Sequence, residues 1–331
     1  MGRLIVVVLG LAILAASAAA PLAVYSVTLA AFGLPHVLSE LRYVDRRFGR
    51  GLGGRTVLAM AGLLAAIVAA RGAALLHLLP PSVEQPLELA LVALVALTAA
   101  RGSATPRLLA VCLALVIGVL AIADPFETMV GFSILHNLTP LGFLWQLAPP
   151  RRRTRVMASA AAAFLGLPLL AASGAPRMAL SALGVPLATL DPLSAGPLAA
   201  NLPVYVPQGL LSSAHAVDLF TASVVAQQAH YAAVIVVLPW LLSRWSPGAR
   251  GLAPWPRGTV FYAAVAALAA LALSRFAVDF AGARGVYSLA AAVHAWIEIP
   301  ILILALTSPQ PATRNPAANE AALAPSETSI A

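Results

Sequence analysis

Long apolar stretches, separated by short loops rich in arginine, run through most of the sequence. A stretch of about 20 apolar residues is long enough to cross the hydrocarbon core of a bilayer as a helix. Backbone polar groups must be paired inside a membrane, so such stretches fold as helices. With 61% hydrophobic and 10% charged residues and a mean hydropathy of +0.91, the chain is expected to be an all-α, polytopic membrane bundle.

The apolar stretches predict about ten transmembrane helices. They cover roughly residues 4–20, 22–44, 56–79, 87–100, 108–123, 125–148, 156–173, 210–240, 258–274 and 286–307. Residues 1–307 then form one transmembrane domain, in which the Pro- and Gly-rich residues 174–208 make a long outer loop. The polar residues 308–331 are expected to be a disordered cytoplasmic tail. Residues 4–20 also resemble a signal peptide, but their charged N-terminal region is weak, which favours a retained helix.

The arginines predict the orientation of the helices. Most of them lie in alternate loops, which are residues 46–55, 101–107, 151–155 and 244–257. The opposite loops hold only Arg177, Arg275 and Arg284. Because positively charged loops stay in the cytoplasm, both termini are expected there, and the expected location is a bacterial inner membrane. The net charge of +8 therefore reflects topology, and nucleic acid is not an expected partner.

Two residue counts exclude whole classes of site. The sequence contains no lysine, so a retinal or pyridoxal Schiff base and a P-loop lysine are excluded. Its single cysteine, Cys112, excludes a disulfide framework and a zinc or iron–sulfur site built on cysteines within one chain. Any metal must therefore be held by histidine and carboxylate side chains.

Ionisable side chains recur near the middle of several predicted spans. His36 and Glu40 are four residues apart and lie on one helix face, as do His294 and Glu298. Counted from the outer ends at 1.5 Å per residue, His36, His136 and His294 lie roughly 20, 15 and 12 Å deep, and His230 lies near the middle of its span. Such residues are costly in a membrane and commonly functional, so we expect one shared metal or proton site.

The predicted site has two groups of residues. The expected metal ligands are His36, Glu40, His136, His230, His294 and Glu298, and the two glutamates are also the candidate catalytic acid–base groups. A lower-priority group, expected near the site or behind it, is Asn137, His215, Asp218 and Gln227. Each of these polar residues can alternatively be an interhelical hydrogen-bond partner without a chemical role.

Imidazole and carboxylate ligands together suit iron, manganese or zinc. Projecting inward from several helices, they follow the logic of carboxylate di-iron bundles. We therefore expect one or two iron ions in an O2-dependent oxidoreductase. A site within the hydrocarbon core suits a hydrophobic small molecule that enters from the bilayer, and nothing in the sequence identifies a protein partner.

The segment Gly33-Leu34-Pro35-His36-x-x-x-Glu40 resembles the Gly-(Ile/Leu)-Pro-His-Gly-Ala-Leu-Asp motif of the Brp/Blh family. That family consists of polytopic membrane β-carotene 15,15′-dioxygenases, which hold iron with histidines and cleave carotene to retinal. The resemblance implies an iron dioxygenase with His36 as a ligand and Glu40 at the position of the motif's acid. It covers about eight residues, in which Val-Leu-Ser replaces Gly-Ala-Leu and Glu replaces Asp.

Three other functions fit parts of the pattern. Four histidines on four helices can hold two b-type haems, in which case the chain transfers electrons. The buried acids can instead form the relay of a proton-coupled transporter, which would show broken helices and internal repeats. Finally, the polar residues can simply join the helices of a structural membrane protein.

Overall fold

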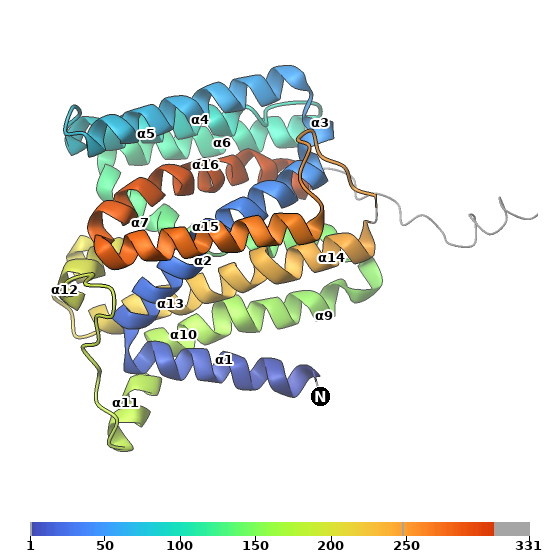
Figure 1. Cartoon of the computed structure of the whole chain (residues 1–331). Helices are drawn as coiled ribbons and strands as arrows, with labels where there is room; N and C mark the ends of the chain where they lie inside the picture. Colours follow the sequence, from blue (N-terminus) through green and yellow to red (C-terminus); the bar gives the residue numbers. More distant parts are fainter. Residues whose placement is uncertain (1, 247, 308–331) are drawn as a thin grey trace, which may run out of the picture.

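The computed structural model describes residues 2–246 and 248–307, which are helices joined by loops, without a β-strand in these ranges. Figure 1 shows the longer helices lying side by side in layers. The helices α4 (Gly54–Leu75), α5 (Pro81–Leu97) and α6 (Ala104–Ala123) form one side of the bundle. The opposite side is formed by α1 (Gly2–Ala19). The expected all-α bundle is confirmed for these residues, whereas the expected tail lies outside them.

Seven helical segments are long and apolar enough to cross a membrane. They are Pro21–Leu52, Gly54–Leu75, Ala104–Ala123, Pro150–Ala172, Ala216–Trp245, Gly258–Val278 and Phe280–Thr307. Three of these segments contain a π-helical turn, and their α-helical parts are α2 (Pro21–Val44), α3 (Arg50–Leu52), α9 (Pro150–Ala161), α10 (Leu167–Ala172), α13 (Ala216–Ala232) and α14 (Leu238–Trp245). The other four segments are α4, α6, α15 (Gly258–Val278) and α16 (Phe280–Thr307).

The predicted count of about ten spans is not supported. The other three predicted spans correspond to α1, to α5 and to the pair α7 (Pro125–His136) and α8 (Thr139–Leu147). Pro80 and Pro81 fix the start of α5 and leave it with 17 residues. A turn at Asn137 and Leu138 divides the predicted helix over residues 125–148 into pieces of 12 and 9 residues. A helix break removes one predicted span from the count, and the late start of α5 removes another.

Local sequence determines where α7 begins and where α8 begins after the break. The start of α7 is capped by Asp124, whose side chain accepts a hydrogen bond from the Glu127 amide. At the other end, Pro140 stands in the first turn of α8, where its missing N–H group costs nothing. The Thr139 hydroxyl donates to the carbonyl oxygen of His136 at 2.7 Å, which pairs one of the carbonyls exposed by the break.

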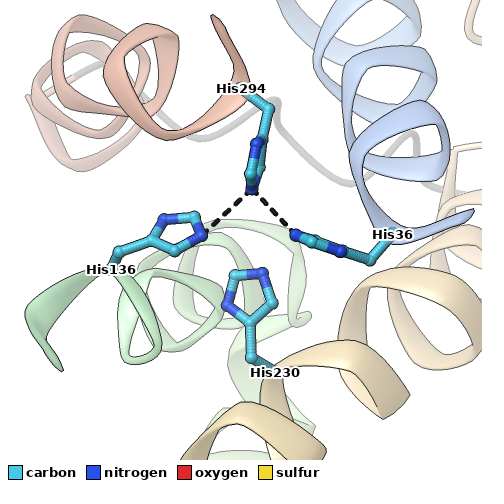
Figure 2. A group of neighbouring side chains, drawn as sticks. All are labelled: His36, His136, His230 and His294. Carbon is cyan, nitrogen blue, oxygen red and sulfur yellow. Dashed lines mark hydrogen bonds between the residues drawn. The ribbon is translucent and has the colours of Figure 1, made fainter. Parts of the chain in front are cut away.

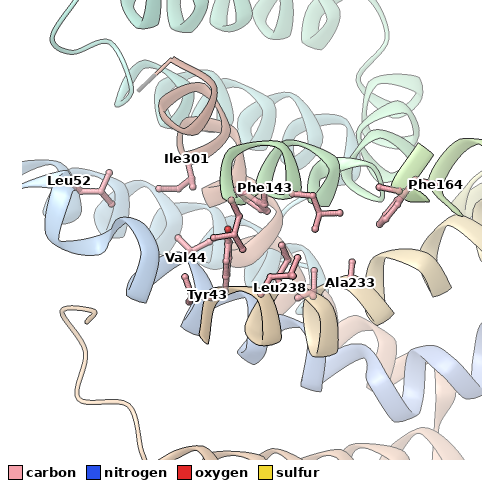
Figure 3. Close-up of a cluster of buried hydrophobic side chains, with 14 of the residues drawn as sticks. Tyr43, Val44, Leu52, Phe143, Phe164, Ala233, Leu238 and Ile301 are labelled. Carbon is pink, nitrogen blue, oxygen red and sulfur yellow. The ribbon is translucent and has the colours of Figure 1, made fainter. Parts of the chain in front are cut away.

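The centre of the bundle is α16, which packs against α2, α4, α5, α6, α8 and α15. One apolar cluster lies toward its C-terminal half and includes Tyr43, Phe143, Leu238 and Ile301 (Figure 3). A second apolar cluster lies toward its N-terminal end and joins residues of α2, α13 and α16 to residues 193–206. Along α2, α13 and α16 the histidines occur between these two clusters.

The connection over residues 174–208 is only partly helical. It contains α11 (Ala175–Ala182), α12 (Leu198–Asn201) and the short 3₁₀ turn η3 (Leu202–Val204), and a further 3₁₀ turn, η4 (Gln208–Leu210), follows it. Leu202, Tyr205 and Val206 are buried against the N-terminal parts of α2 and α13. This connection therefore covers the end of the bundle that the arginine pattern predicts to be outside.

A buried carboxylate joins α4, α5 and α16. Glu88 is fully buried, and one of its oxygens lies 2.6 Å from Nε of Arg71. Its other oxygen accepts a hydrogen bond of 2.6 Å from the indole Nε1 of Trp296. A buried ion pair is costly to break because removal of one partner leaves the other without compensation.

We predict that Glu88→Gln lowers the free energy of unfolding by on the order of 3 kcal/mol, because Arg71 loses the buried carboxylate that contacts it at 2.6 Å. Thermal unfolding of the purified protein in detergent measures the loss. The matched control is the double variant Arg71→Met/Glu88→Leu, which removes both charges and should regain part of the lost stability. A Glu88→Gln protein with the unfolding midpoint of the wild type would contradict the prediction.

Candidate metal centre

Four histidine side chains converge in the middle of the bundle, as Figure 2 shows. They come from four different helices: His36 from α2, His136 from the last residue of α7, His230 from α13 and His294 from α16. Each offers one ring nitrogen, and these four nitrogens lie within 4.8 Å of one another. The expectation that the four histidines share one place is therefore met by their geometry.

The spacing of the ring nitrogens suits ligands of a single ion. Nε2 of His294 lies 2.9 Å from Nε2 of His36 and 3.0 Å from Nε2 of His136. Two imidazole nitrogens at about 2.1 Å from one metal would be about 3.0 Å apart at a right angle and about 3.4 Å apart at a tetrahedral angle. These two separations lie at or just below the short end of this range, and all four nitrogens lie within 4.8 Å of one another, so the cluster could hold one metal ion.

Burial makes the cluster costly unless something satisfies it. His36, His230 and His294 are all but fully buried. Both ring nitrogens of His230 and Nδ1 of His294 have no hydrogen-bond partner among the residues that the structure describes. An unpaired buried polar atom costs roughly 1–3 kcal/mol. A cation at the centre would give one nitrogen of the His230 ring a partner, whereas Nδ1 of His294 is on the far side of its ring from the cluster.

Local structure fixes the ring of His36. Its Nδ1 lies 3.3 Å from the carbonyl oxygen of Phe32, one turn earlier in α2, which leaves Nε2 to face the cluster. The ring of Tyr231 stacks on it with centroids 4.3 Å apart. Gly33 allows a second aromatic ring to approach, because a Cβ atom there would lie 3.0 Å from Tyr287. These contacts hold the imidazole in one orientation, as the outer partners of a metal ligand do.

His136 is held by a carboxylate from another helix. Its Nδ1 lies 2.6 Å from one oxygen of Glu298, and the other oxygen lies 2.8 Å from the Thr139 hydroxyl, whose single proton is shared between this carboxylate and the carbonyl of His136. Hydrogen bonding from the outer nitrogen of a histidine ligand to a carboxylate is typical of metal sites. Because Thr139 begins α8, the same carboxylate also ties α16 to the break that places His136.

Glu40 lies beside His230. One of its oxygens is 3.4 Å from Nε2 of that ring, without hydrogen-bond geometry, and the fully buried carboxylate has no hydrogen-bond partner among the described residues. A π-helical turn, η5 (Ala233–Val237), begins three residues after His230, and such turns are frequent at functional sites. Each predicted glutamate thus contacts a histidine of a different helix from its own. Direct ligation of a metal by Glu40 or Glu298 stays a prediction.

The lower-priority residues lie in two places. Gln227 donates a hydrogen bond of 2.7 Å to the hydroxyl of Tyr231 and so acts on the ring that stacks on His36. Asn137 follows His136 and donates to the carbonyl of Ser133. His215 and Asp218 are at the N-terminal end of α13, the end predicted to be outside, and His230 of the cluster lies more than ten residues further along the chain.

At that outer end, Asp218 accepts two hydrogen bonds of 2.8 Å from Arg177 of α11. This contact raises the pKa of the Arg177 guanidinium. His215 is 71% exposed and lies 3.9 Å from Asp218. These residues form an ion pair that fastens the outer connection to α13, and they do not join the histidine cluster.

A cavity of about 420 Å³ adjoins the cluster. His36, His136 and His294 form part of its wall, together with four of the chain's six tyrosines: Tyr25, Tyr205, Tyr231 and Tyr287. A volume of this size lies within the range of small-molecule sites.

The contributions of Tyr287 and Thr139 to the surroundings of the histidine cluster had not been predicted. The only available signal was the Thr139-Pro140 pair after His136, which is typical of a helix start.

No family model matches this chain, and neither a curated protein nor a solved structure does. The resemblance of residues 33–40 to the Brp/Blh motif therefore remains a prediction, and the geometry of the four histidines is the observation on which a functional proposal rests.

Proposed function

We propose that this chain is a membrane metalloenzyme that holds one iron ion between His36, His136, His230 and His294 and oxidises a lipid-soluble substrate with O2. The observation that carries this proposal is the convergence of four imidazole nitrogens, from three buried histidines and one partly buried histidine, within 4.8 Å of one another. Imidazole suits iron as well as zinc, copper and nickel. The choice of iron is supported by the resemblance at His36, and a dioxygenase reaction needs no external reductant because both oxygen atoms enter the product.

The residues around the cluster divide the remaining tasks. The bound ion would supply the O2 chemistry that side chains lack. Glu298 holds the imidazole of His136 in the orientation that turns Nε2 inward. The carboxylate of Glu40, which lacks a hydrogen-bond partner in the described chain, is the candidate to accept or return a proton. The adjoining cavity keeps the substrate next to three of the ligands and away from bulk water.

The geometry argues against the b-type haem alternative. A bis-histidine haem places its two ligands on opposite faces of a porphyrin ring, so the imidazoles of each pair are separated by the plane of the macrocycle. Here the four rings face one another, with centroids 4.6 Å apart for His36 and His294 and 4.6 Å apart for His136 and His230. No space for a macrocycle is left between them.

One observation favours a transporter as the second candidate. The break between α7 and α8 places the end of a helix at a buried polar site, as the broken helices of transporters do. A transporter must release its cargo, whereas a resident cofactor stays bound. Dialysis of the purified protein against a weak chelator separates the two, since retention of stoichiometric metal favours the enzyme and rapid exchange favours the transporter.

We predict that iron copurifies at close to one ion per chain, and that His36→Ala, His136→Ala, His230→Ala and His294→Ala each remove it. Each substitution deletes one of the converging ligands and leaves an incomplete site. Elemental analysis of the purified variants measures the metal content, and an optical spectrum without a Soret band separates iron bound by side chains from haem.

The matched controls are His77→Ala and His215→Ala, which remove the two histidines outside the cluster and should leave the metal content unchanged. Zinc or copper at the same stoichiometry would replace iron in the proposal but keep the site. Wild-type protein without any metal after purification in metal-supplemented medium would refute the metalloenzyme.

Glu298 is predicted to position a ligand. Glu298→Gln should weaken metal binding by about 10–100-fold, the usual effect of removing an outer partner of a metal-bound histidine. Competition with a chelator of known affinity measures the change, and Thr139→Val, which removes the hydrogen bond to the same carboxylate, should have a smaller effect in the same direction. If Glu298→Gln loses the metal as completely as His136→Ala, the carboxylate is itself a ligand.

A further inference from the structure

The cavity beside the histidine cluster is not the apolar pocket that a pure hydrocarbon would require. Its wall includes four tyrosines, and it also includes the two arginines Arg71 and Arg284. Ionisable side chains within membrane segments commonly mark the path of a substrate or an ion. The charges of the two arginines therefore bear on the kind of molecule that this cavity accepts.

Arg71 is neutralised by the protein itself. Its Nε donates to the buried carboxylate of Glu88 at 2.6 Å, and its second contact is with the carbonyl oxygen of Ser288 at 3.4 Å. The same carboxylate is held by Trp296. This pair is a structural link between α4, α5 and α16 and leaves no net charge facing the cavity.

Arg284 has no such partner. In the described part of the chain no carboxylate lies within 4.0 Å of it. Its contacts are with neutral groups, the amide oxygen of Asn201 at 3.3 Å and the hydroxyl of Tyr25. A guanidinium carries five N–H donors and binds carboxylate or phosphate in a bidentate manner. Most of these donors remain available, so Arg284 contributes a net positive charge and free hydrogen-bond donors to the cavity wall.

The position of Arg284 in α16 determines how far its helix position lies from the histidine cluster. It lies ten residues before His294 in the continuous helix α16, which corresponds to about 15 Å along the helix axis. Between them the cavity is walled by aromatic rings, including Tyr287 and Tyr231, and by small residues of α16 such as Ala291 and Ala295. The cavity thus joins a cationic end, a largely apolar middle and the histidine cluster.

We propose that the substrate is a single-chain amphiphile whose anionic head group, a carboxylate or a phosphate, is bound by Arg284 while its chain reaches the histidine cluster. This inference rests on the proposed function and names its substrate class. A hydrocarbon without a head group offers the guanidinium no acceptor. At Arg71 the counter-charge is the carboxylate of Glu88. At Arg284 the anionic head group of the substrate would be the counter-charge. The distance between head group and cluster then determines which carbon atom of the chain is placed beside the ligands.

Binding can be measured without catalysis. The full-length protein in nanodiscs of phosphatidylcholine is titrated calorimetrically with tetradecanoate, with tetradecyl phosphate and with tetradecanol, which has the same chain but no charge. We expect the anionic probes to bind the wild type more tightly than the alcohol. Arg284→Gln should weaken the preferred anion by about 10–100-fold and leave the alcohol unchanged, because the charged hydrogen bonds are lost.

Two variants control this result. Arg275→Gln removes an exposed arginine from the last turn of α15, which is followed in the chain by the start of α16. Arg275 is not part of the cavity wall, so this variant should bind the probes like the wild type. Arg284→Lys keeps the charge without the planar fork and should restore part of the affinity, with thermal unfolding showing that each variant is folded. Whichever anion loses more affinity in Arg284→Gln identifies the head group as carboxylate or phosphate.

Equal affinities for anion and alcohol in the wild type, or an unchanged anion affinity in Arg284→Gln, would overturn the inference. Metal analysis of the same preparations separates this from the proposed function. Protein that lacks metal but binds anions through Arg284 would refute the oxygenase and keep the head-group site. Protein with stoichiometric iron and no dependence on Arg284 would refute only the head-group site.

Discussion

The energetic constraint on which this bundle depends is the burial of four imidazoles at one point. Each imidazole ring has two polar nitrogens, and burial without a partner costs roughly 1–3 kcal/mol for each. The outer nitrogens of two rings are met by the protein, at the carbonyl of Phe32 and at the carboxylate of Glu298. The inner nitrogens face one another at 2.9–3.0 Å, an arrangement that a cation would stabilise. Binding of a cation there would therefore be coupled to folding at the same atoms.

The grouping of the four histidines could be predicted from the sequence, because the depth of a residue in a membrane depends only on its position along the helix. A constant rise per residue placed His36, His136, His230 and His294 at similar depths, and the structure brings them together. Helix rotation is not fixed by depth, and an apolar membrane helix has little periodicity to reveal it. The sequence could therefore indicate which histidines share a layer, but not which neighbour each glutamate meets. Glu40 and Glu298 share a helix face with His36 and His294, yet contact His230 and His136 instead.

The span count failed for a related reason. Hydropathy detects apolar length, and residues 125–148 are apolar throughout most of their length. It does not detect a helix break that the surrounding protein tolerates, since buried backbone can be irregular where other residues satisfy it. Here the Thr139 hydroxyl supplies such a partner to the carbonyl oxygen of His136, and the carboxylate of Glu298 contacts the same hydroxyl. The break has a consequence for the site, because it ends α7 at His136 and frees this side chain from the register of a continuous helix.

The pairing of acids and histidines across helices also explains how the site is kept in place. Glu40 of α2 contacts His230 of α13, and Glu298 of α16 contacts His136 of α7. Each pair links two helices, and the histidine cluster joins both pairs. A shift of any one of these four helices would then break a buried carboxylate contact as well as displace an imidazole of the cluster. The aromatic and arginine side chains of the adjoining cavity are attached to the same helices, since Tyr287 and Arg284 precede His294 on α16. The contacts that position the four imidazoles thereby also set the distance between the cluster and the cationic end of the cavity.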